Sequence, residues 1–263
     1  PVFVMENVKG MLSSQSGGSG IFAQIMKDLR EPGQGLEYEV HSLVVNKDPN
    51  DLNPNDFIIR AEQYGVPQKR HRVILVGIRK KFFADGTAVG KLEVRSRVEV
   101  KDALKGMPKL RSGISPARAD DQLAWETIRD GVIYGQVVKS KAPTSRGGRS
   151  LKRTATPAGE YGDWVIDVNL DDVIQHESRS HMVEDLKRYR YAALKAKADG
   201  VSPKLRQFPR DLQPEHKNAG HESRPFEDRF RVQVEHEPST TVVSHISKDG
   251  HYYIHPDPDQ MRS

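Results

Sequence analysis

The stretch PVFVMENVKGM (residues 1–11) sets the expected fold class of the first part of the chain. Residues 2–5 form a short apolar run, and such runs are typical of strands that are buried on both faces. The run ends in Glu6 and Asn7. In an open parallel sheet, ligands bind beyond the carboxyl ends of the strands, so these two residues are candidates for chemistry. The alternative is that Glu6 is a solvated carboxylate at the end of a strand.

The residues that follow favour an α/β fold. IFAQIMKDLR (21–30) places its apolar residues on one helical face, and YEVHSLVVN (38–46) has the pattern of a strand. Strand–helix–strand is the unit from which parallel sheets are built. VILV (73–76) predicts a further strand. We therefore predict a first α/β region that closes near residue 81.

Turn residues and charges dominate the second part of the chain. Short strands are predicted at 131–138 and 163–168, with three more in 230–263, and SHMVEDLKRYRYAALKAKADG (180–200) predicts a helix ended by glycine. The prediction for residues 99–263 is a small, irregular, β-rich region.

A basic segment at 139–153 is a candidate for DNA contact. It contains six cations and no acid: Lys139, Lys141, Arg146, Arg149, Lys152 and Arg153. A basic loop rich in glycine, serine and threonine suits salt-sensitive contacts to phosphates, although a solvated loop would have the same composition. The formal net charge of +5 also favours a polyanionic partner.

The composition excludes several classes of chemistry within these residues. The chain has no cysteine, which excludes disulfides, thiolate metal sites and a cysteine nucleophile. The ten histidines lack the spacing of a helical zinc site, so we predict no metal. No apolar run is long enough to cross a bilayer, so we predict no membrane partner.

Glu6 and Asn7 form a candidate constellation with PQKRHRVILVG (67–77), which supplies Gln68, Arg70 and Arg72. Alternate residues of a strand share a face, so the two arginines are expected on one side. Two guanidiniums beside a carboxylate suit a nucleobase or a phosphate. An ordinary ion pair between Glu6 and one arginine is the alternative.

Two motifs carry a resemblance to a known family. FVMENVKGM (3–11) and AEQYGVPQKRHRVILVGIR (61–79) resemble, in order, the Glu-Asn-Val and Gln-x-Arg-x-Arg motifs of the DNA (cytosine-5) methyltransferases. The tail from residue 228 is similar to the end of the family's target-recognition region. The residue pattern and the resemblance together predict that residues 1–98 form the C-terminal half of the catalytic domain, a partial Rossmann-like sheet with a final antiparallel strand. The resemblance implies that residues 99–263 form the target-recognition region.

The resemblance also implies a mechanism and roles. A cytosine is flipped out of double-stranded DNA, a cysteine thiolate attacks ring carbon 6, and carbon 5 takes a methyl group from S-adenosylmethionine. Glu6 would form hydrogen bonds with the ring nitrogen and the exocyclic amine and would supply a proton. Arg72 would contact the base carbonyl oxygen and orient Glu6. Arg70 and Gln68 would support this arrangement or the sugar–phosphate, and Asn7 would hold the backbone.

The departures from the family pattern are equally informative. The family's Pro-Cys nucleophile motif and glycine-rich cofactor loop precede the Glu-Asn-Val strand and are not found here, so the cofactor-binding residues are unknown. The last two family motifs would begin at Arg262–Ser263. We therefore expect a fragment that is inactive alone, from a bacterial cytoplasmic enzyme of a family that often has a companion restriction endonuclease. A non-catalytic basic DNA-binding module, using residues 139–153 for phosphates, is the alternative function.

Overall fold

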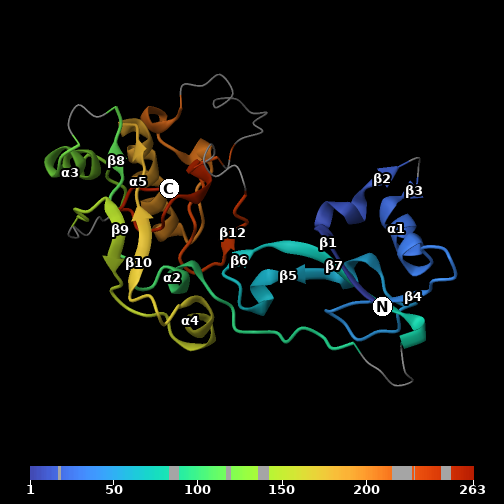
Figure 1. The fold of residues 1–263 in the computed structure, drawn as a ribbon. Coiled ribbons are helices and arrows are strands. Elements are labelled where there is room, and N and C mark those ends of the chain that lie inside the picture. The colour runs from blue at the N-terminus through green and yellow to red at the C-terminus, as the bar shows by residue number, and fades with distance from the viewer. Residues whose placement is uncertain are drawn as a thin grey trace. The chain divides into compact units, whose positions relative to one another are not determined.

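The computed structural model describes residues 1–16, 19–82, 89–116, 120–135, 142–214, 227, 229–243 and 250–263 (Figure 1). The chain divides into two units, Pro1–Arg97 (unit 1) and Val98–Ser263 (unit 2). No described helix is long and apolar enough to span a membrane.

The sheet of unit 1 is centred on β7 (His71–Arg79). β1 (Val2–Val8) pairs with one edge of β7, while β4 (Tyr38–His41) and β5 (Ile58–Arg60) share the other edge, all antiparallel to it. Because β1 and β4 both run opposite to β7, they are parallel to each other, with α1 (Ile21–Arg30) between them in the chain. The remaining short strands are β2 (Gln15–Ser16), β3 (Ser19–Gly20) and β6 (Gln68–Lys69).

The core of unit 1 lies between α1 and the sheet. Phe22 and Met26 of α1 are buried, which confirms the predicted apolar face of this helix. They belong to one cluster with Val40 of β4 and with Val73 and Leu75 of the central strand β7. The helix α1 thereby covers one face of the sheet.

The prediction that the first strand is buried on both faces is wrong. Side chains of β1 alternate, so that Phe3 and Met5 pack against the core while Val2 and Val4 are 59% and 67% exposed. The physical reason is that β1 has a sheet neighbour on one edge only and helical cover on one face. Its apolar run therefore has an open side in the described part of unit 1.

Gly77 makes room for an aromatic ring and carries a testable prediction. Phe3 lies opposite Gly77 in the β1–β7 ladder, and a Cβ at residue 77 would lie 2.0 Å from Cε1 of Phe3. We expect Gly77→Ala to lower the free energy of unfolding by about 1–3 kcal/mol, because the ring must move out of a packed position. Urea denaturation measures this change. Gly10→Ala is the control, because a Cβ there meets nothing within 4 Å. Equal losses in the two variants would contradict the packing argument.

Unit 2 mixes short strands with helices. Its helices are α2 (Val100–Ala103), α3 (Gln122–Asp130), α4 (Gly159–Val165) and α5 (Val183–Asp199). Its strands are β8 (Gly113–Ile114), β9 (Gly147–Lys152), β10 (Asp172–Glu177), β11 (Ser180–His181) and β12 (Ser239–Thr240). β9 and β10 form an antiparallel ribbon, and β8 pairs in parallel with β11.

The core of unit 2 surrounds α5. The helix ends at Gly200 with φ +73°, as the sequence predicted. Leu186 and Tyr189 of α5 are fully buried, and they pack in one cluster with Trp125 and Met261. This cluster collects residues from almost the whole length of the unit.

The α/β class is confirmed, but the β-rich prediction for 99–263 is wrong, because helices make up more of the described part than strands do. Residues 131–135 follow α3 without forming a strand, and 136–138 lie outside the described residues. Residues 163–165 belong to α4, and 166–168 are irregular. The described part of 230–263 holds β12, one 3₁₀ turn and an isolated bridge. Short apolar runs do not distinguish strand from helix or coil, which is why these predictions failed.

A half-buried histidine that contacts Tyr189 of the core makes the stability of unit 2 depend on pH. Burial lowers the pKa of His181 to about 4, and its Nδ1 lies 3.3 Å from Oη of Tyr189. The unfolded value is about 6.5. The unfolded chain therefore binds the proton first, and stability present above pH 6.5 is lost as the pH falls toward 4. We expect His181 to contribute a loss of about 2 kcal/mol between pH 7 and pH 5.

Urea unfolding of the chain and of His181→Gln at the two pH values isolates this contribution. The variant should lose less stability on acidification than the parent chain. It should still lose some, because burial also lowers the pKa of His255. Identical pH dependence in the two proteins would contradict the assignment.

Candidate functional site

Glu6 and Arg72 meet on the open face of the unit 1 sheet. In the β1–β7 ladder, Val8 lies opposite Arg72 and Glu6 lies opposite Ile74, so Glu6 and Arg72 are diagonal neighbours. Nε of Arg72 is 2.7 Å from Oε1 of Glu6, and the side chains are 20% and 52% exposed respectively. An ion pair this exposed contributes at most about 1 kcal/mol to stability. An ion pair between Glu6 and one arginine is also the arrangement that the sequence analysis gave as the alternative to a binding constellation.

The Arg72 guanidinium is held at two points. Besides contacting Glu6, its Nη1 donates to the carbonyl oxygen of His71 at 2.8 Å. Among the described residues, no other side chain contacts the Glu6 carboxylate. The pair thus presents a fixed guanidinium beside a carboxylate with an accessible side.

A second pair, which the sequence analysis did not identify, supports the start of β7. Nε2 of His71 lies 2.8 Å from Oε1 of Glu62, which is in a 3₁₀ turn after β5. This contact fixes the residue directly before Arg72. The only sequence signal is a histidine between two arginines, and an acid nine positions earlier across a turn is not recognisable as its partner.

The other members of the predicted constellation make local contacts. Oδ1 of Asn7 accepts from the backbone N–H of Val8 at 2.8 Å. The backbone N–H of Gln68 donates to Val66, and its carbonyl oxygen accepts from Arg70. Arg70 is exposed and precedes β7, and no described contact joins its side chain to the Glu6–Arg72 pair. The structure therefore brings one of the two arginines to Glu6.

The basic segment 139–153 is in part a strand, so its prediction as a loop is wrong for 147–152. Lys139 and Lys141 lie outside the described residues. Nη1 of Arg146 is 2.9 Å from Oδ2 of Asp120, and its Nη2 donates to Oγ of Ser180 at 3.0 Å. Arg146 is thus engaged inside unit 2.

The remaining described cations of this segment differ in whether their side chains have an ion-pair partner. Nζ of Lys152 is 2.7 Å from Oδ1 of Asp172 across the ribbon, in a solvent-exposed ion pair. Arg149 is exposed and Arg153 is half-buried, and neither has a side-chain partner among the described residues. These two arginines are the described cations of the segment that remain available to an anionic ligand.

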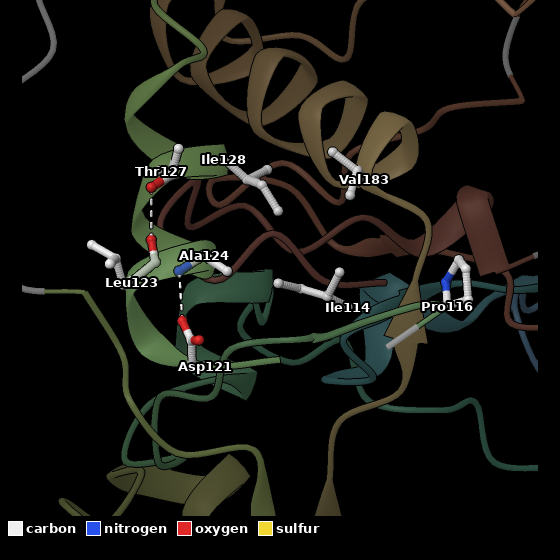
Figure 2. Close-up of a pocket in the computed structure, with 8 residues that line it drawn as sticks. All are labelled: Ile114, Pro116, Asp121, Leu123, Ala124, Thr127, Ile128 and Val183. Atoms are coloured by element: carbon white, nitrogen blue, oxygen red, sulfur yellow. Dashed lines mark hydrogen bonds between the residues drawn. The ribbon is translucent and has the colours of Figure 1, made fainter. Parts of the chain in front are cut away.

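A hollow of about 500 Å³ lies between α3 and the start of α5 (Figure 2). Most of its lining is apolar: Ile114, Pro116, Leu123, Ala124, Ile128 and Val183. The side chains of its two polar residues form hydrogen bonds within α3. Asp121 accepts from the N–H of Ala124, and Thr127 donates to the carbonyl oxygen of Leu123. None of the predicted site residues lines it. The described residues also contain no cluster of three or more His, Asp or Glu side chains suited to a metal ion.

Sequence comparison now identifies the family. The family model for C-5 cytosine-specific DNA methylases matches residues 1–226, which include the Glu6 and Arg72 motifs. The chain belongs to the C-5 cytosine-specific DNA methylase family.

Three curated relatives are bacterial type II methyltransferases. M.Bpa9945I of Bacillus paralicheniformis is 28% identical over 99% of this chain and 49% of its own length. M.BspRI of Lysinibacillus sphaericus is 40% identical over 30% of this chain and 14% of its own length. M.BbvI of Brevibacillus brevis is 38% identical over 30% of this chain and 17% of its own length. The chain thus spans about half the length of the first relative and less of the others.

A solved structure described as a prophage-encoded DNA modification methyltransferase (E. coli) also resembles the chain. The TM-score is 0.49 at 16% sequence identity, and the match covers 99% of this chain and 55% of that one.

Proposed function

We propose that this chain orients the target cytosine in a DNA (cytosine-5) methyltransferase that acts on double-stranded DNA. The observation that carries the proposal is the Glu6–Arg72 pair, which joins the two family motifs at 2.7 Å on an open sheet face. Family membership supplies the reaction class, methyl transfer to carbon 5 of cytosine. S-adenosylmethionine is the methyl donor that this class implies.

In this proposal Glu6 is the catalytic acid that acts on the ring. Its carboxyl forms hydrogen bonds with the ring nitrogen N3 and with the exocyclic amine of a flipped-out cytosine. Proton donation to N3 makes carbon 6 more electrophilic and so assists attack by a nucleophile. Arg72 contacts the base carbonyl oxygen and holds the Glu6 carboxyl in place. Arg70, Gln68 and Asn7 remain proposed supports of this site.

The described residues around Glu6 do not form a pocket for S-adenosylmethionine. Val4 and Val8, on the same face of β1 as Glu6, are 67% and 53% exposed, so this face is open rather than enclosed. The chain also has no cysteine, so the thiolate that attacks carbon 6 must be supplied from outside these residues.

We further propose that unit 2 is the target-recognition region. Arg149 and Arg153 are its available cations in the 139–153 segment, with Lys139 and Lys141 as additional candidates. Arg146 and Lys152 are weaker candidates, because both are engaged with aspartates. By similarity to the type II methyltransferases, a companion restriction endonuclease is the proposed functional partner.

Assay of the complete gene product tests the proposal. It is incubated with labelled S-adenosylmethionine and double-stranded DNA, and the digested nucleosides are analysed by mass spectrometry. The proposal expects 5-methylcytosine. DNA binding without any methylated cytosine would contradict it and favour the alternative of a non-catalytic DNA-binding module, for which the absence of cysteine is the supporting observation.

A further inference from the structure

The β9–β10 ribbon has two unpartnered polar side chains at the same step of its ladder. β9 and β10 lie side by side (Figure 1), and because Ile174 pairs with Ser150 and His176 with Gly148, Gln175 and Arg149 occupy the step between. Both side chains are exposed, and neither has a partner among the described residues.

Gln175 has a backbone conformation that is rare for its residue type. Its φ is +52°, in the left-handed region that non-glycine residues seldom adopt. Across the ribbon, Gly147 has φ +95°, and a Cβ there would lie 1.9 Å from the carbonyl oxygen of His176. On β9, the residue with positive φ that lies close to the opposite strand is a glycine, Gly147. On β10, the residue with positive φ is a glutamine, Gln175, for which this conformation is strained. Strained residues of this kind cluster at binding and active sites.

We propose that the β9–β10 ribbon enters the major groove of DNA and that Arg149 and Gln175 read base edges there. The inference rests on the proposed function, because it takes double-stranded DNA as the ligand of unit 2. The major groove accommodates a two-stranded ribbon, and arginine pairs with O6 and N7 of guanine, while glutamine pairs with N6 and N7 of adenine. The two residues would therefore determine specificity rather than chemistry.

The charges on the ribbon favour bases over phosphates. Lys152 is already paired with Asp172, and Glu177 adds a negative charge at the other end of β10. Arg149 is the unpaired cation among the described ribbon residues, and a phosphate-tracking surface would need several.

Selection of bound duplexes tests the inference with the 263-residue chain. A pool of double-stranded oligonucleotides, randomised around a fixed cytosine, is bound, recovered and sequenced. We expect the parent chain to enrich guanine and adenine at defined positions. Arg149→Ala should lose the guanine preference about tenfold, and Gln175→Ala should lose the adenine preference to a similar extent. Affinity for the unselected pool should change far less.

Two further variants separate base reading from charge and from folding. Arg210→Ala removes an exposed arginine elsewhere in unit 2, and it should leave the base preference unchanged. Gln175→Gly relieves the positive φ, so it should raise the melting temperature by about 2–4 °C while abolishing the adenine preference. A loss of preference in a more stable protein cannot come from unfolding.

The remaining outcomes overturn the inference in distinguishable ways. If Arg149→Ala and Gln175→Gly keep the parent preference, or lose affinity equally for all sequences, the ribbon does not read bases. A parent chain that binds duplex DNA without base preference also overturns the inference but leaves the proposed function standing. A parent chain that binds no duplex overturns the recognition role proposed for unit 2 and this inference with it.

Discussion

Glu6→Gln in the complete gene product is expected to slow cytosine methylation by about 10²–10⁴-fold, with duplex affinity retained. Glutamine keeps the size of the side chain but cannot donate the proton that activates the cytosine ring. The Glu6 side chain is 52% exposed, so its loss as a charge should change the stability of unit 1 by no more than about 1 kcal/mol. Single-turnover methylation with labelled S-adenosylmethionine measures the rate.

Glu37→Gln is the matched control. Glu37 forms a comparable surface ion pair, with Oε2 2.9 Å from Nζ of Lys80. The substitution removes the same charge from the same unit without touching the proposed site, so its methylation rate should equal that of the parent. Undiminished methylation in Glu6→Gln would refute the role of the acid. Equal slowing in both variants would show that surface charge alone is responsible.

Asp120→Ala is expected to destabilise unit 2 by about 3–5 kcal/mol, because it strands a buried guanidinium. Asp120 accepts from Nη1 of Arg111 and from Nη1 of Arg146 at 2.5 and 2.9 Å. Arg111 is only 7% exposed in its side chain and lies over the ring of Trp125. Without the carboxylate, this cation keeps backbone acceptors but no counter-charge. Urea denaturation at pH 7 measures the loss.

Arg146→Ala separates the contribution of Arg146 to the stability of unit 2 from that of Arg111. The Arg146 side chain is 43% exposed, and its removal leaves the buried Arg111–Asp120 pair in place. The expected loss is therefore only about 1 kcal/mol. A loss as large as that of Asp120→Ala would mean that the outer arginine, rather than charge burial, holds this part of unit 2 together.

The periodicity of apolar residues predicted the helix and the strand whose side chains form the core of unit 1. The apolar spacing of 21–30 identified α1, because one face of that helix alone is buried. The apolar residues at 73–76 identified the centre of β7, which is buried between neighbours on both edges. The strand positions of Glu6 and of the two arginines predicted a contact between them, but not which arginine makes it. The roles of Glu6 and Arg72 remain proposals.

Features that depend on the partners of a segment were not predictable. The apolar run of β1 is the same whether or not a second layer covers it, so its open face could not be inferred from Val2 and Val4. Arg146 and Arg149 are three residues apart in a uniformly basic segment, yet one reaches the distant Asp120 and the other has no described partner. The positive φ of Gln175 likewise has no sequence signal, since glycine or asparagine is the usual mark of that conformation.

The composition of the unit 2 core fixes the order in which the protein can fold during its synthesis. The unit 1 cluster is complete once residue 75 has been made, whereas α5 packs against Ile254 and Met261 as well as Trp125. At elongation rates of about 5–20 residues per second, α5 leaves the ribosome on the order of seconds before those two residues follow it. During that interval Leu186 and Tyr189 lack part of their partners. Nascent chains of this protein should therefore engage chaperones after unit 1 has folded, and truncations before Ile254 should aggregate.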